Sequence, residues 1–80
     1  MEERITDLVE CLTQIEGDVS LPRPIKLKIR NAIIALGEDK EFKTRANKAL
    51  RELDEVSDNP TLPSYLRPQI WNVVSMLEGF

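Results

Sequence analysis

Apolar residues recur every three or four positions along four stretches of this 80-residue chain, and this spacing limits most strongly what the chain can fold into. In the first stretch, over about residues 2–16, they are Ile5, Leu8, Val9, Leu12 and Ile15. Comparable stripes occupy about residues 22–36, 40–57 and 63–78. Since no stretch alternates apolar and polar residues as a half-buried strand does, the sequence predicts an all-α protein.

The two halves of the chain resemble each other when the sequence is shifted by 41 positions. The shift places Leu21-Pro22 on Leu62-Pro63 and Ile29 on Ile70. Each half, residues 1–39 and 42–80, is predicted to be a helix, a loop and a second helix. A repeat near 40 residues with two helices is typical of HEAT or armadillo units, but a solenoid needs about three of them. We therefore predict one domain over residues 1–80, folded as a compact four-helix bundle from two similar hairpins.

Several residues predict where the helices begin and end. Gly17 and Gly37 follow the first two stripes, where a left-handed helix end needs no Cβ. Ser20 and Thr61 are candidate caps for the second and fourth helices. Pro68 leaves two alternatives, a kinked helix from Thr61 or a short turn at 63–67 followed by the main helix, and we favour the second.

Short sequence segments carry a resemblance to a known family. They are the Asp-Asn-Pro-x-Leu-Pro stretch at 58–63, Ile70-Trp71-Asn72, the Leu77-Glu78 ending, and the earlier Leu21-Pro22-Arg23. Over nearly its whole length the chain resembles the small archaeal uncharacterised protein family zero-one-four-seven. The resemblance implies a compact multihelical bundle of archaeal, cytoplasmic origin. It implies no activity and supplies no functional residues.

The residues needed for most catalytic and metal sites are few. The chain contains no histidine and a single cysteine, Cys11, so it lacks the usual neutral-pH base, a structural zinc ligand set and an internal disulfide. No glycine-rich phosphate loop is present. We expect no catalytic residues, no metal and no cofactor, and we expect Cys11 and Trp71 to pack within the bundle.

Charge is distributed unevenly along the chain. Residues 1–20 hold one basic and six acidic groups, residues 21–51 hold nine and three, and residues 52–80 hold one and five. The candidate basic surface consists of Arg23, Lys26, Arg30, Arg45 and Lys48. Such a surface could contact the phosphates of a nucleic acid. The alternative, which we favour, is that these cations are solvated or are paired with the acidic helices.

Two apolar residues lie off the stripe of the second helix. Leu27 and Ile34 are seven positions apart, so they share a helix face that the stripe does not include. That face could bind a partner protein or a second copy of the chain. The sequence therefore favours a non-enzymatic protein–protein interaction module, with a nucleic-acid or ribonucleoprotein accessory protein as the alternative. No apolar run is long enough to span a membrane, and we expect a cytoplasmic protein.

Overall fold

The computed structural model describes residues 2–79, with Glu2 described by its backbone alone. The helices are α1 (Glu2–Glu16), α2 (Arg23–Leu36), α3 (Phe42–Asp58) and α4 (Arg67–Glu78), and the single 3₁₀ turn η1 (Ser64–Leu66) precedes α4. No strand occurs within residues 2–79. The prediction of an all-α fold is confirmed.

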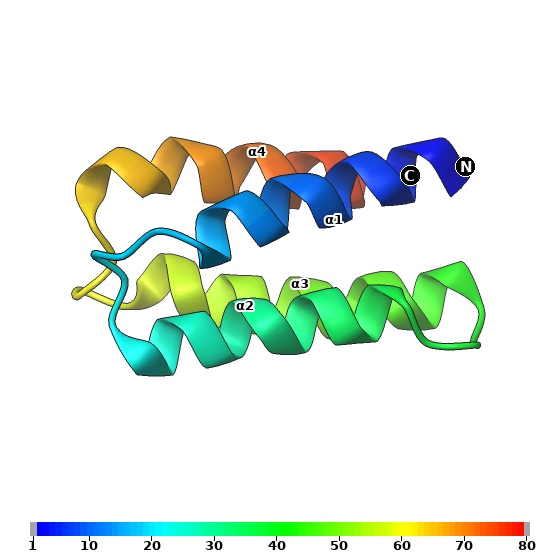
Figure 1. Ribbon diagram of the computed structural model, residues 1–80. Helices are drawn as coiled ribbons and strands as arrows, with labels where there is room; N and C mark the ends of the chain where they lie inside the picture. The colour runs from blue at the N-terminus through cyan, green and yellow to red at the C-terminus, as the bar shows by residue number, and fades with distance from the viewer. Residues whose placement is uncertain (1, 80) are drawn as a thin grey trace.

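The four helices form an up-down-up-down bundle (Figure 1). Each helix packs against the next one along the chain, and α1 also contacts α4, which closes the ring. The start of α1 and the end of α4 lie at the same end of the bundle (Figure 1). Short loops force consecutive helices to be antiparallel neighbours, and the predicted four-helix bundle is therefore confirmed.

The centre of the bundle is made of the predicted stripes. The largest fully buried side chains are Leu8, Leu12, Ile25, Ile29, Leu36, Leu53, Val56, Ile70 and Val73. Burial of one such side chain is worth about 1.5–3 kcal/mol relative to leaving it exposed. Among the side chains that the structure describes, no polar or charged one is fully buried. The described interior therefore serves packing, and the chemical groups lie on the surface.

The loops before α2 and η1 contain the same hydrogen-bonded turn. Asp18 Oδ1 accepts bonds from the Ser20 backbone N–H at 2.8 Å and from Ser20 Oγ at 2.6 Å. Asn59 Oδ1 accepts bonds from the Thr61 backbone N–H at 2.9 Å and from Thr61 Oγ1 at 2.7 Å. Ser20 and Thr61 are therefore not helix caps, and that prediction was wrong. Pro22 occupies the cap position of α2 and makes no side-chain cap bond.

The helix ends differ from the prediction at the glycines. Gly37 ends α2 with φ −93° and ψ −2°, and no glycine within residues 2–79 has a positive φ. The Gly37 N–H donates to the carbonyls of Ile33 and Ile34, so a tightened last turn satisfies the helix end without a left-handed residue.

The start of α4 agrees with the favoured alternative. A short 3₁₀ turn covers residues 64–66, and Pro68 lies in the first turn of α4, where its missing N–H removes no helix hydrogen bond.

Candidate functional site

The most unusual surface of the bundle is the outer face of α2, which we define as Arg23, Leu27, Arg30, Asn31 and Ile34. All five side chains are exposed. Leu27 is 54% exposed and Ile34 is 56% exposed. The two are separated by two helical turns, about 10 Å along the axis. Two large aliphatic side chains thus project from the side of α2 that faces away from the core.

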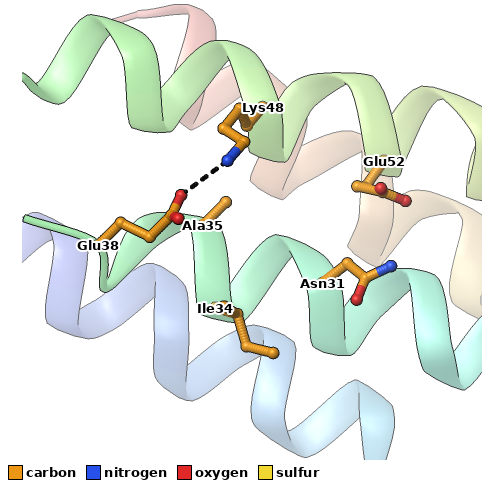
Figure 2. A pocket seen from close by; sticks show the side chains of 6 residues that line it. All are labelled: Asn31, Ile34, Ala35, Glu38, Lys48 and Glu52. Carbon is orange, nitrogen blue, oxygen red and sulfur yellow. Dashed lines mark hydrogen bonds and ion pairs between the residues drawn. The ribbon is translucent and has the colours of Figure 1, made fainter. Parts of the chain in front are cut away.

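A shallow groove runs beside this face, between α2 and α3 (Figure 2). Its volume is about 230 Å³. It is lined by Asn31, Ile34, Ala35 and Glu38 from the α2 side and by Lys48 and Glu52 from α3. Ile34 therefore belongs to both the outer face of α2 and the groove, which makes the two features one continuous surface.

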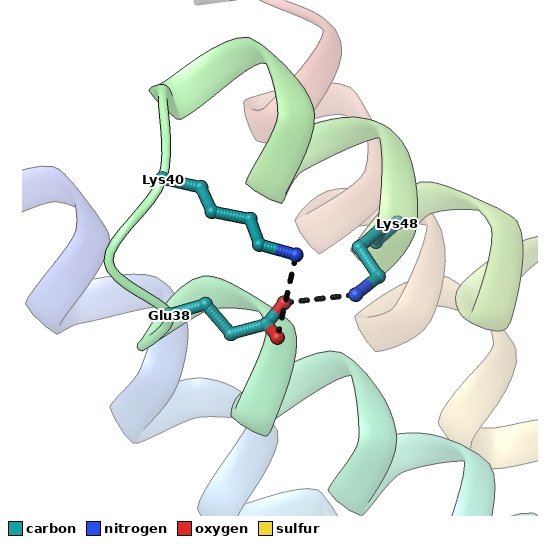
Figure 3. Close-up of polar contacts among 3 residues, drawn as sticks. All are labelled: Glu38, Lys40 and Lys48. Carbon is teal, nitrogen blue, oxygen red and sulfur yellow. Dashed lines mark hydrogen bonds and ion pairs between the residues drawn. The ribbon is translucent and has the colours of Figure 1, made fainter.

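An ion-pair cluster lies at one end of the groove (Figures 2 and 3). Lys48 Nζ is 3.0 Å from Glu38 Oε1, and Lys40 Nζ is 3.9 Å from Glu38 Oε2. The hydrogen bond from Lys48 is the main reason that the pKa of Glu38 lies below its ordinary value, with the charge of Lys40 adding to the effect. The Glu38 carboxylate is consequently ionised at neutral pH, and it fixes the loop after α2 against α3.

The predicted basic surface is divided by ion pairs. Arg30 Nε lies 2.7 Å from Glu16 Oε2, on the α1 side of α2. Lys48 extends from α3, on the other side of α2, and pairs with Glu38. Arg23 is exposed and makes no ion pair within residues 2–79. Arg23 therefore has no carboxylate partner within the described bundle.

Arg45 lies apart from that surface. Its side chain is partly buried, and Nη1 donates to the backbone carbonyl of Leu36 at 2.9 Å. The guanidinium carbon is 5.8 Å from the centroid of the Phe42 ring. Nε is buried with no hydrogen-bond partner. Arg45 thus joins the end of α2 to the start of α3.

A polar cluster that the sequence did not indicate ties the first loop to η1. The Tyr65 hydroxyl donates to Asp18 Oδ2 at 2.7 Å and lies 2.7 Å from Ser20 Oγ. The pKa of Asp18 is lowered by the hydrogen bond from Ser20, then by that from Tyr65, and to a smaller degree by the charge of Lys26. Lys26 is thus near enough to Asp18 for its charge to act on this loop. The distance of 47 residues between Asp18 and Tyr65 explains why no local pattern revealed the pair.

Two other predicted side chains lie closer to solvent than expected. Trp71 is 57% exposed, so the expectation that it packs within the bundle was wrong. Cys11 is partly buried and packs against the core. A second hollow between α3 and α4 has Phe42, Leu50 and Leu77 among its lining residues. Trp71 is the one large apolar side chain that is exposed on α4.

Residues 2–79 show neither a cluster of metal-binding side chains nor a helix suited to span a membrane. No group of three or more histidine, cysteine, aspartate or glutamate side chains within residues 2–79 is placed to hold a metal ion. None of the helices formed by these residues has the length and apolar character needed to cross a bilayer.

Comparison with known proteins places the whole chain among a set of archaeal relatives. The model of an uncharacterised protein family, UPF0147, matches residues 1–80. A UPF0147 protein of Pyrococcus abyssi is 38% identical over 80 residues, which cover 98% of this chain and 93% of the relative. A UPF0147 protein of Sulfurisphaera tokodaii is 39% identical over 79 residues, which cover 96% and 88%. The crystal structure of the protein MMP1188, whose function is unknown, aligns with a TM-score of 0.93 at 34% identity, covering 99% of this chain and 91% of that one.

Proposed function

Because the chain belongs to the uncharacterised protein family UPF0147, whose description states no activity, we propose a function from the surface itself. The domain is a non-enzymatic protein-binding module. Its contact surface is the outer face of α2 together with the adjoining groove between α2 and α3.

The observation that carries this proposal is the exposure of Leu27 and Ile34 on one side of one helix. Single exposed apolar residues are ordinary on protein surfaces, whereas aligned ones beside a groove are typical of interaction sites. The other large exposed apolar residues differ from this pair. Val19 lies in a loop, the Tyr65 hydroxyl is hydrogen-bonded, and Trp71 has no second exposed apolar residue beside it on α4.

The ion pairs support a protein partner over a nucleic acid. Phosphate binding depends on cations that are free to replace the counterions of the backbone. Lys28 and Lys48 donate to Glu55 and Glu38, and Arg30 is paired with Glu16. A phosphate would have to compete with these carboxylates, whereas an apolar partner surface could cover Leu27 and Ile34 without breaking any of the pairs.

Affinity capture from the native cell tests the proposal, with nuclease-treated and untreated extracts compared. The test variant is Leu27→Glu, and the matched control is Val19→Glu, which places the same charge on a loop residue that is 95% exposed. Circular dichroism checks that all variants stay folded. We expect a protein that the wild type and the control retain after nuclease treatment and that the α2 variant loses. Equal retention by all three proteins, or retention that nuclease abolishes, would overturn the proposal.

A further inference from the structure

We infer that the outer face of α2 binds the same face of a second copy of this chain, with the two α2 helices antiparallel and a two-fold axis passing between Arg30 and Asn31. This inference rests on the proposed function, because it names the partner for the surface described there.

A two-fold interface is reciprocal, so that if residue i contacts residue j of the partner, residue j also contacts residue i of the partner. On an antiparallel helix pair this requires all contacting pairs to share one midpoint. The midpoint of Leu27 and Ile34 lies between residues 30 and 31, and the same point in the sequence lies midway between Arg23, the first residue of α2, and Glu38, in the turn just after α2 ends at Leu36. A single axis therefore places Leu27 against Ile34 and Arg23 against Glu38, twice each.

The pairing covers two exposed apolar side chains and brings Arg23 to a carboxylate. Leu27 and Ile34 are each more than half exposed, and they would cover one another across the axis. Arg23 makes no ion pair within residues 2–79, whereas Glu38 lies at the groove end as a carboxylate with its pKa lowered. Arg23 of each copy would thus add a third cation beside a carboxylate that already attracts Lys48 and Lys40.

The same charges oppose the other orientation. If the two α2 helices were parallel, Arg23 would face Arg23 and Glu38 would face Glu38. Like charges directly opposite one another destabilise an interface, and they are a common means of fixing helix orientation. The antiparallel arrangement is therefore the one favoured by the order of charges along α2 and the turn after it.

The size of the contact surface determines how tightly the two copies are expected to bind. α2 has 14 residues and is therefore about 21 Å long. One helix face of this length is smaller than a standard interface, which buries about 800 Å² on each partner. We therefore expect a weak dimer, with a dissociation constant between about 10 µM and about 1 mM.

Sedimentation equilibrium up to about 1 mM protein tests for the dimer. We expect the wild type and Val19→Glu to dimerise, and Leu27→Glu to raise the dissociation constant at least about tenfold. Arg23→Glu should weaken the dimer, because it places a carboxylate beside Glu38 of the partner copy, whereas Arg23→Lys should leave it nearly unchanged. A chain that remains monomeric at this concentration, or a dimer that Leu27→Glu leaves unchanged, would overturn the inference.

Disulfide cross-linking tests the register. In a Cys11→Ser background, Leu27→Cys chains and Ile34→Cys chains are oxidised separately and as a mixture. The proposed pairing predicts a cross-linked dimer in the mixture alone, because identical positions in the two copies are offset by about 10 Å along the helix, beyond disulfide reach. Cross-linking of one variant with itself would show a different register and overturn the pairing.

Failure of these two tests is distinguishable from failure of the proposed function. A strictly monomeric chain that still captures a protein through Leu27 and Ile34 would overturn the self-pairing alone. A chain that neither pairs nor captures a protein through these residues would overturn both.

Discussion

The contrast between the two faces of α2 can be measured with one substitution made at two positions. Ile29 is fully buried and Ile34 is 56% exposed, and both lie in the same helix. Changing each to alanine alters the intrinsic helix propensity and the unfolded chain in nearly the same way. The difference between the two variants therefore isolates burial.

The expected magnitudes follow from those exposures. Truncation of a fully buried isoleucine to alanine costs about 2–5 kcal/mol, because it removes apolar contacts and leaves a cavity. At Ile34 less than half of the side chain is covered, so the free energy of unfolding should fall by about 1 kcal/mol or less. A domain of this size has a total stability of about 4–12 kcal/mol. Ile29→Ala should therefore lower the melting temperature by roughly 10 °C or more.

Urea unfolding followed by far-ultraviolet circular dichroism provides the assay, at a concentration of about 1 µM, where the proposed dimer is largely dissociated. Both variants should keep the urea dependence of the wild type, so that the shift in midpoint reports stability. Equal losses for Ile29→Ala and Ile34→Ala in dilute solution would show that Ile34 is covered within the monomer. That result would refute the exposed apolar face and, with it, the proposed contact surface.

Three further predictions concern other surfaces. Because the pKa of Asp18 is lowered in the fold, its charge stabilises the folded state above the ordinary pKa and loses this effect as the pH falls through the lowered value. Asp18→Asn should thus be less stable than the wild type at pH 7, and the gap should close in acid unfolding experiments. Arg67→Met should cost about 1–2 kcal/mol in urea unfolding, since it removes the 2.7 Å bond from Arg67 Nη1 to the Ser57 carbonyl near the end of α3. Fluorescence of Trp71, the single tryptophan, should be readily quenched by acrylamide, and a fully shielded signal would contradict its exposure.

The fold could be predicted from the sequence because apolar spacing alone determines which side of each helix is buried. Residues at the centre of a stripe, such as Leu12, Ile29 and Leu53, are fully buried. Residues at its margin, such as Val9 and Ile33, are partly buried. The periodicity gives the direction of burial, whereas its degree depends on how closely the neighbouring helix approaches, which no single segment determines.

Helix ends were predicted less well because short polar side chains have competing local partners. Ser20 and Thr61 fit the composition of a helix cap, yet each bonds to the Asp18 or Asn59 side chain two residues earlier. In both loops a proline two residues later, Pro22 or Pro63, then occupies the cap position of the next helix or turn. Serine and threonine favour both arrangements, and the choice depends on an aspartate or asparagine at the right spacing.

In the candidate site, too, features set by nearby residues could be predicted, whereas contacts between residues distant in the sequence could not. The spacing of Leu27 and Ile34 was sufficient to place them off the buried stripe of α2. The state of the cations was not predictable, because Lys28 pairs with Glu55, 27 residues away, and Arg30 pairs with Glu16 on the preceding helix.

These pairs give the uneven charge of the chain a structural explanation. Lys28 and Arg30 of the basic middle pair with carboxylates of the acidic segments, and Lys40 and Lys48 pair with Glu38, so part of its charge is compensated within the bundle. Leu27 and Ile34 are, in contrast, each more than half exposed, so the neighbouring helices leave most of this apolar pair uncovered. A partner is therefore needed to explain the exposed leucine and isoleucine more than it is needed to explain the lysines and arginines.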